Sequence, residues 1–169
     1  MRIDEVAIRE FLHTAYPRLV AAVALVCRSR PAAEDAVQEA LLKAWERSER
    51  GEEIESLNAW VTTVALNHAR SGLRRLRAEG RARSRMRGSL PDEPSADRID
   101  VERALSTLPR RQREAVVLRY YLQLDTREVA AALRINEGTV KSTLFRARAA
   151  LAATLGIEID EEANDRGSR

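Results

Sequence analysis

Residues 125–151 read DTREVAAALRINEGTVKSTLFRARAAL, and this stretch carries the clearest structural signal in the chain. Apolar residues recur at helical spacing on both sides of a break at residues 134–136, which predicts two helices joined by a tight turn. Asp125 and Glu128 form a capping-box pattern for the first helix, and Asn136 suits the N-cap of the second. The sequence therefore predicts a helix-turn-helix.

The second helix of this stretch has two faces of different chemistry. One face is an apolar stripe at helical spacing, made of Val140, Leu144, Ala147 and Leu151. The other side carries Lys141, Ser142, Phe145, Arg146 and Arg148. A buried stripe opposite long cations and short hydroxyls suits a helix that packs on its own domain and enters a DNA groove. The alternative is a surface helical hairpin whose basic face is only solvated.

The composition favours a helical protein. Hydrophobic residues make up 44% of the 169-residue chain but aromatic residues only 4%, so Ala, Leu and Val must fill the core. Such a core is more typical of helices than of sheets. The length suits one domain or two small ones.

Other patterns exclude several classes of function. No apolar run approaches the length of a membrane span, and the acidic start MRIDEVAIREF is unlike a secretory signal, so we expect a cytoplasmic protein without membrane insertion. Cys27 is the only cysteine and lies in an apolar run, so we interpret it as a core residue. No Cys/His cluster, acid/base pair, nucleophile constellation or phosphate-binding glycine loop is visible. We therefore expect no metal, no cofactor, no small-molecule substrate and no catalysis.

The net charge of +3 is distributed unevenly along the chain. Residues 101–155 carry ten basic and five acidic groups, whereas residues 1–78 carry twelve and eleven. The basic excess therefore lies on the segment with the helix-turn-helix, as an electrostatic footprint for DNA requires. A second run of arginines extends from residue 70 to residue 87, and either contact with a nucleic-acid backbone or simple solvation would explain it.

The chain divides into two helical parts. Helical patterns begin near Val6, at Pro17 and at Pro31. A fourth covers residues 57–78, with Trp60, Val64 and Leu73 on its core side and Leu57 and Ala65 adjoining. Periodicity is absent from residue 80 to about residue 99, where Arg, Ser, Pro and Asp predominate, as in a flexible linker. We expect an all-α fold of two small helical domains, at 1–79 and 101–155, with a flexible linker at 80–100 and an acidic, disordered tail at 156–169.

Two blocks of the sequence resemble bacterial RNA polymerase sigma factors of the extracytoplasmic-function group, within the sigma-70 family. The first block is AEDAVQEALLKAW followed by SLNAWVTTVALNHARSGLRR, and it is similar to the family's region 2, which binds core polymerase and melts promoters. The second is LPRRQREAVVLRYYLQLDTREVAAALRINEGTVKSTLFRARAAL, and it is similar to region 4, which reads the upstream promoter element. The resemblance covers nearly the whole chain and implies a dissociable transcription initiation factor.

The resemblance implies roles for individual residues. The expected contact with core RNA polymerase is made by Asp35, Gln38 and Glu39. In the minus-ten region of promoter DNA, Asn67 would lie beside an unstacked base, and nearby phosphates would be held by Arg70, Arg74 and Arg75. In the minus-thirty-five element, the major groove would be read by Lys141, Ser142, Phe145 and Arg146, with phosphate contacts from Thr139 and Arg148. An anti-sigma factor is a further partner that the resemblance implies.

The sequence departs from the family pattern at a few positions. The loop from Glu49 to Glu55 is acidic and lacks the aromatic residue that many relatives place there. Arg134 and Gln123 stand where relatives often have glycine. Two other functions stay open: a free-standing DNA-binding regulator whose amino-terminal half senses a ligand or dimerises, and a sigma-like protein that mainly binds partners.

Overall fold

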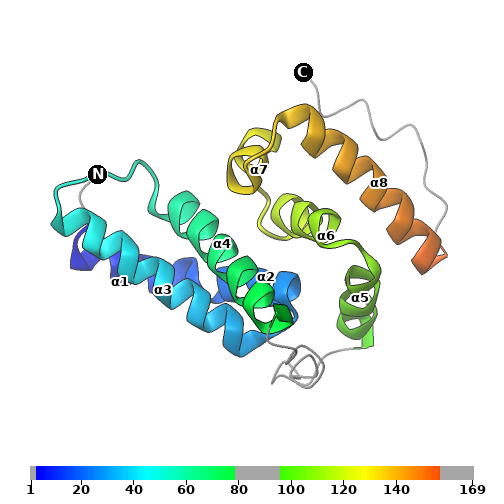
Figure 1. Ribbon diagram of the computed structural model, residues 1–169, viewed down its shortest axis with the longest axis horizontal. Helices are drawn as coiled ribbons and strands as arrows, with labels where there is room; N and C mark the ends of the chain where they lie inside the picture. Colours follow the sequence, from blue (N-terminus) through cyan, green and yellow to red (C-terminus); the bar gives the residue numbers. More distant parts are fainter. Residues whose placement is uncertain (1–2, 79–95, 157–169) are drawn as a thin grey trace.

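The computed structural model describes residues 3–78 and 96–156, and the side chains of residues 3–72 and 100–156. Every regular element in these ranges is a helix, which confirms the all-α expectation (Figure 1). The first unit contains α1 (Glu5–Thr14), α2 (Tyr16–Cys27), α3 (Arg30–Glu49) and α4 (Leu57–Ala78). The second unit contains α5 (Ala96–Thr107), α6 (Arg110–Val116), the π-helical turn η2 (Val117–Tyr121), α7 (Thr126–Leu133) and α8 (Glu137–Leu155).

Local capping chemistry sets the helix ends in the first unit. The Ser29 side chain accepts a hydrogen bond from the Ala32 N–H at 3.3 Å, so it caps α3, and Pro31 follows in the first turn. Gly51 lies just beyond α3 with φ +78°, a left-handed conformation that ends a helix at low cost when the residue is glycine. Ser56 accepts from the Ala59 N–H at 3.3 Å and caps α4. The observed α4 has the bounds expected from the sequence.

The core of the first unit is built on α3, which packs between α2 and α4. Small residues at helical spacing on α3 are completely buried and let its neighbours approach closely; they are Ala33, Ala36, Ala40 and Ala44. On α4 the expected core side was partly wrong. Leu57 and Ala65, expected beside the core side, are buried, and so are Val61 and Leu66, whereas Trp60 and Val64 are only half-buried and pack against the core. Because α4 contacts both α2 and α3, its buried face is centred between them rather than on a single stripe. Leu73 lies outside the described side chains.

The second unit differs from the sequence prediction at two places. Helix α5 begins at Ala96, upstream of residue 101, so the end of the expected linker is helical. After α6 the chain widens into η2, where the Leu122 N–H donates to the Val117 carbonyl at 3.0 Å. A π-turn shifts the phase of the following residues, and such turns are frequent at functional sites. As a result Leu118 is buried while Tyr120 and Tyr121 are exposed.

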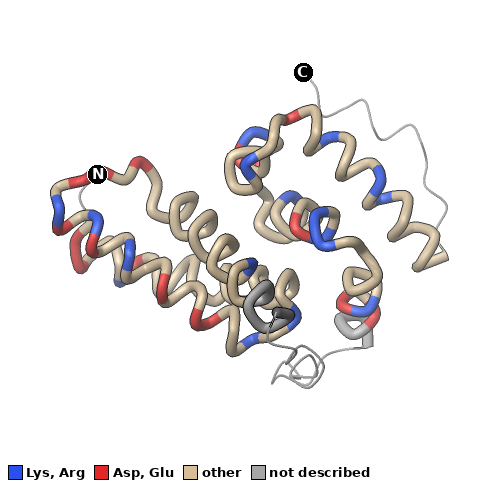
Figure 2. Tube along the Cα trace, viewed as in Figure 1, with Lys and Arg blue, Asp and Glu red and all other residues tan. Residues whose placement is uncertain are grey.

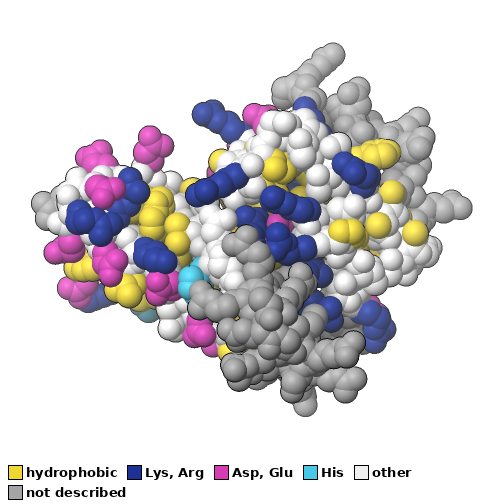
Figure 3. Space-filling view, viewed as in Figure 1, with side chains coloured by type: hydrophobic (Ala, Val, Ile, Leu, Met, Phe, Trp, Pro, Cys, Tyr) yellow, Lys and Arg dark blue, Asp and Glu magenta, His cyan; other side chains and the backbone are white. Residues whose placement is uncertain are grey.

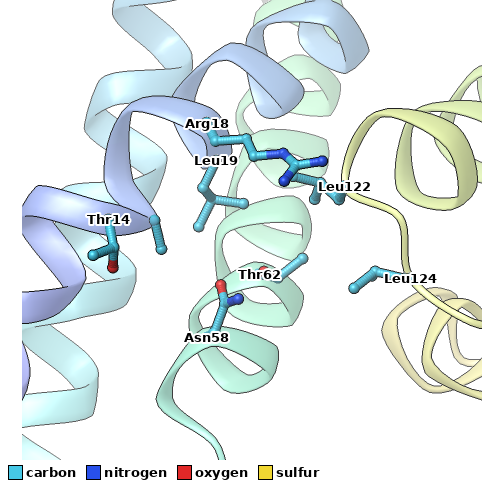
Figure 4. A pocket seen from close by; sticks show the side chains of 8 residues that line it. Thr14, Arg18, Leu19, Asn58, Thr62, Leu122 and Leu124 are labelled. Atoms are coloured by element: carbon cyan, nitrogen blue, oxygen red, sulfur yellow. The ribbon is translucent and has the colours of Figure 1, made fainter.

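The two units pack against each other. Helix α4 contacts α7, and α2 contacts η2 and α6. Buried residues of both units belong to one apolar cluster. A cleft of about 260 Å³ lies along this contact, and it is lined by residues of both units: Thr14, Ala15, Arg18, Leu19, Asn58, Thr62, Leu122 and Leu124 (Figure 4). The cleft therefore exists only while the units are together.

Candidate DNA-binding and polymerase-binding surfaces

The helix-turn-helix forms as its capping residues predict. The Asp125 carboxylate accepts from the Glu128 N–H at 2.7 Å, and the Glu128 carboxylate accepts from the Asp125 N–H at 2.7 Å, which completes the capping box. Asn136 accepts from the Thr139 N–H at 2.7 Å and caps α8. Between the helices Arg134 adopts φ 54°, a left-handed conformation that glycine adopts more easily. The turn is thus formed at some cost in backbone strain.

Helix α8 has the two faces that the sequence predicts. Val140 and Ala147 are completely buried and Leu144 is nearly so, while Leu151 is half-buried. The opposite face is exposed and carries Thr139, Lys141, Ser142, Phe145 and Arg146. Glu137, at the start of the helix, is its only acidic residue (Figure 2). The helix therefore presents a basic surface to the outside over residues 139–148.

Two details of this surface bear on what it can bind. Phe145 is 60% exposed although it is aromatic, so its ring is available for an apolar contact such as a thymine methyl group. Arg148 is only half-buried and makes an interaction within the protein, which makes it the least available of the six predicted residues. Helix α8 packs on α5, α6 and α7, and it lies on the side of the second unit away from α4 (Figure 1).

The residues expected to hold the minus-ten region are on α4, and the structure engages two of them internally. Arg70 is 11% exposed, and its Nη1 donates to the Asn67 side-chain oxygen at 3.0 Å. Its Nε and Nη2 donate to the two carboxylate oxygens of Glu114 at 2.9 and 3.0 Å. The side chains of Arg74 and Arg75 lie outside the described part of the chain. Asn67 and Arg70 are therefore adjacent, as expected, but Arg70 faces the second unit.

Sequence reasoning missed Glu114. It is completely buried, and Arg110 and Arg111 of its own helix approach its carboxylate at 3.4 and 4.0 Å. The available signal was weak: an acidic residue that directly precedes the buried run Ala115, Val116 and Val117. A charge in such a position needs partners, because an unpaired buried carboxylate is costly.

The expected polymerase-docking residues share one face of α3. Asp35 and Gln38 are exposed, and Glu39 is half-buried and paired with Lys43 at 3.0 Å. Leu42 continues the same face one turn further, and it is 53% exposed although its neighbour Leu41 is buried. Trp45, 38% exposed, borders the face. Leu42 lies four positions after Gln38 and three after Glu39, and Trp45 lies three after Leu42, so helical spacing relates both apolar residues to this face although neither was expected there.

Charge separates the two ends of the molecule. Acidic side chains gather over the end of the first unit where α3 runs into the loop to α4, while basic side chains gather over the second unit and where the units meet (Figure 3). In the acidic loop Glu52 pairs with Arg47 at 3.1 Å and with Arg50 at 3.3 Å. Basic surfaces suit DNA and acidic surfaces repel it, so the second unit is the better candidate for contact with duplex DNA.

Neither a membrane span nor a metal cluster is found within residues 3–78 and 96–156. No single helix there is long and apolar enough to cross a membrane, and α1 with α2 meets the criterion only as a pair bent by 60°. No group of three or more His, Cys, Asp or Glu side chains in these ranges could hold a metal ion. Cys27 is buried, as expected of a core residue, and burial raises the pKa of its thiol.

Comparisons with known proteins identify two domains of one family. Residues 12–79 match sigma-70 region 2, and residues 98–151 match sigma-70 region 4. The sigma factor SigL of Mycobacterium tuberculosis is 38% identical over 131 residues, which are 73% of this chain and 74% of SigL. The sigma-E factor of Streptomyces coelicolor is 36% identical over 141 residues, covering 81% of this chain and 80% of that factor.

Solved structures show the same architecture. The sigma factor RpoE of Bartonella quintana, solved with its anti-sigma factor NepR, has a TM-score of 0.77 and 29% identity, covering 92% of this chain and 100% of RpoE. CnrH, solved with the cytosolic domain of CnrY, is 24% identical with a TM-score of 0.68, covers 90% of each chain and supports the fold alone. The two family regions, their order and the identity to SigL and sigma-E together decide the assignment. The chain therefore belongs to the extracytoplasmic-function group of the sigma-70 family of RNA polymerase sigma factors.

Proposed function

We propose that this sigma factor initiates transcription through three surfaces, one for polymerase and two for promoter DNA. The exposed face of α8 reads the upstream element as duplex, with Lys141 and Arg146 donating to base edges and Phe145 packing on a thymine methyl group. Thr139 and Arg148 hold phosphates and fix the register of the helix. The single observation that carries this assignment is the division of α8 into a buried apolar stripe and an exposed basic face.

The first unit supplies the other two surfaces. Asp35, Gln38 and Glu39 on α3 dock on core polymerase, and exposed Leu42 adds an apolar contact to the same patch. Asn67 and Arg70 on α4 hold the melted minus-ten strand, together with Arg74 and Arg75. The chain has one domain at 1–79 and another at 101–155, and residues 80–100 join them. Binding of both domains to the same polymerase would fix the spacing between them. Each domain then binds DNA at a lower ordering cost than it would alone.

Localisation, catalysis and a regulatory partner follow from this function. A factor that works on polymerase and promoter DNA acts in the cytoplasm and catalyses no bond-forming step, because polymerase makes the RNA. The tail at 156–169 carries no role in this account. RpoE of Bartonella quintana was solved with an anti-sigma factor, and we propose that a partner of that class also holds this chain inactive.

One experiment tests the function as a whole. Purified chain is added to core polymerase on genomic DNA, and the 5′ ends of the transcripts are sequenced. Starts that appear only with the chain, downstream of a shared pair of elements, support the proposal. A gel shift with the chain alone distinguishes a sigma factor from a free-standing DNA-binding regulator, because such a regulator would bind its site tightly without polymerase.

A further inference from the structure

The contact between Arg70 and Glu114 joins the two units at the residues assigned to melted DNA. Arg70 comes from α4 and Glu114 from α6, and they are 44 positions apart in the sequence. Two parallel hydrogen bonds of 2.9 and 3.0 Å connect the guanidinium to both oxygens of the carboxylate. Paired, charge-assisted hydrogen bonds of this kind are among the strongest in proteins. The contact is a specific one, because the planar guanidinium matches both oxygens of the carboxylate at once.

This contact occupies the groups that DNA would need. Two of the three guanidinium nitrogens of Arg70 donate to Glu114, and the third donates to Asn67. Arg70 is 11% exposed in this arrangement, so a phosphate cannot reach it without displacing Glu114. The Asn67 oxygen accepts only from Arg70 of its own helix. We propose that in the free chain the second unit withholds Arg70 from DNA, and that Glu114 is the residue that holds the units closed.

A second polar contact supports the closed arrangement. Exposed Arg18 on α2 donates from Nε to the Tyr121 carbonyl at 3.1 Å and also from Nη2 (Figure 4 shows its side chain extending toward Leu122). Tyr121 ends η2, where backbone carbonyls have no partner within the helix. The arginine of one unit thus caps the π-turn of the other. Apolar packing of Leu122 and Leu124 on the shared cluster adds to the contact.

The closed state can open without leaving a buried charge unpaired. If Arg70 leaves, Glu114 keeps Arg110 and Arg111, whose nitrogens already lie 3.4 and 4.0 Å from its carboxylate. A buried carboxylate with no other partner would make opening prohibitively costly. Here the same carboxylate has cationic neighbours in both states, which suits a contact that is broken during function.

Closure masks one DNA surface and leaves the other accessible. The exposed face of α8 takes no part in the contact between the units, since α8 packs on α5, α6 and α7. The upstream-reading surface is therefore available in the closed chain, while the guanidinium of Arg70 becomes available only after opening. In an equilibrium of this kind, the apparent affinity for melted DNA is the affinity of the open chain multiplied by the fraction of chains that are open. The inference rests on the proposed assignment of Asn67 and Arg70 to the minus-ten region.

The test compares the full chain with Glu114→Gln, which keeps the shape of the side chain but removes its charge. Small-angle scattering without DNA measures the radius of gyration, and fluorescence anisotropy measures binding of a short single-stranded DNA of random sequence. We expect Glu114→Gln to increase the radius and to tighten single-strand binding about tenfold. The control is Glu137→Gln, which removes one negative charge from an exposed residue of α8 and should leave the radius unchanged.

Two further variants test the role of Arg70 in DNA binding and the second contact between the units. Arg70→Gln added to Glu114→Gln should abolish the gain in single-strand binding, because Arg70 is the group that opening releases. Arg18→Ala removes the second contact without touching the buried carboxylate and should also increase the radius. If circular dichroism shows that Glu114→Gln has lost helicity, the radius of gyration of Arg18→Ala tests the closed state instead.

The outcomes separate this inference from the proposed function. An unchanged radius and unchanged single-strand binding in folded Glu114→Gln and in Arg18→Ala would overturn the closed state. A larger radius without tighter binding would support the contact and refute the assignment of Asn67 and Arg70 to DNA.

Discussion

Arg111 and Leu133 are linked across the helix-turn-helix by a hydrogen bond of 3.1 Å, from the guanidinium Nη1 of α6 to the last carbonyl of α7. That bond satisfies a carbonyl that has no partner within its helix, next to the left-handed Arg134. It ties the turn of the motif to the helix that carries Glu114. The orientation of the DNA-reading helix and the contact between the units therefore depend on the same short segment of α6.

The first prediction concerns the exposed face of α8. Lys141→Ala and Arg146→Ala, made separately, should each weaken upstream-element binding by about 1–3 kcal/mol and relax base preference at one position. Stability should not change, because both residues are exposed. The measurement is binding of promoter duplexes by the assembled holoenzyme. Arg127→Ala on α7 is the control, because it also removes one positive charge but should lower the affinity for all sequences alike. An equal loss of base preference in that variant would count against the assignment of Lys141 and Arg146.

The second prediction concerns docking on polymerase. Asp35→Arg combined with Glu39→Arg should abolish co-purification with core enzyme, because the double change reverses the charge of an outward-facing patch without entering the core. The melting temperature should stay within a few degrees of the parent. Glu10→Arg combined with Glu55→Arg makes the same change in charge at exposed positions away from α3 and should leave docking intact. Normal co-purification of the Asp35/Glu39 variant would rule out this face.

The third prediction separates binding from stability at two adjacent leucines. Leu42→Ala should weaken docking but cost little stability, because the side chain is 53% exposed. Leu41→Ala should lower the free energy of unfolding by about 2–5 kcal/mol, because it leaves a cavity in the core. Thermal unfolding and a core-binding titration measure the two effects. If Leu42→Ala destabilised the chain as much as Leu41→Ala does, the exposed face would be part of the core instead.

The fourth prediction concerns backbone strain. Gln123 and Arg134 have φ values of 60° and 54°. Replacing either with glycine should stabilise the chain by about 0.5–1 kcal/mol, as the relief of left-handed strain exceeds the added freedom of the unfolded chain. Ala131→Gly, at an exposed position inside α7, should instead destabilise by about 1 kcal/mol. Denaturant titration measures whether each variant raises or lowers the free energy of unfolding. A lower free energy of unfolding in all three variants would show that Gln123 and Arg134 are not strained.

The fifth prediction concerns Cys27. Burial raises the pKa of its thiol above the ordinary value of 9.0, although a backbone hydrogen bond at Ser29 and the charge of Arg113 act in the opposite direction. The unfolded chain therefore loses this proton at lower pH than the folded chain, so the thiol's contribution to stability is full below pH 9.0 and is lost as the pH rises further. Cys27→Ala should remove this alkaline loss while lowering stability at neutral pH. Rapid alkylation of the native thiol at neutral pH would contradict its burial.

Local chemistry made much of the fold predictable. Asp125, Glu128 and Asn136 fix the ends of the helix-turn-helix through hydrogen bonds that span three residues, so the sequence alone reveals them. The two faces of α8 follow in the same way from helical spacing. The family resemblance then supplied the functions, and the family regions and relatives confirm that assignment.

Long-range relationships could not be predicted. Arg70 was expected at a phosphate, yet it faces Glu114, and no local pattern connects residues 44 positions apart. The buried side of α4 was misjudged at Trp60 and Val64 because the helix has two neighbours. The π-turn η2 also gave no sequence signal. The Arg70–Glu114 pair and η2 belong to the contact between the two units, so the closed arrangement depends on tertiary contacts rather than on local preference.

Transcript-start sequencing with holoenzyme that carries the double variant Lys141→Ala and Arg146→Ala tests whether α8 reads DNA. We expect the parent chain to direct initiation downstream of a shared upstream element, and the variant to lose this preference while it still assembles with core polymerase. Unchanged start sites and unchanged promoter strength in the variant would show that the basic face of α8 does not read DNA.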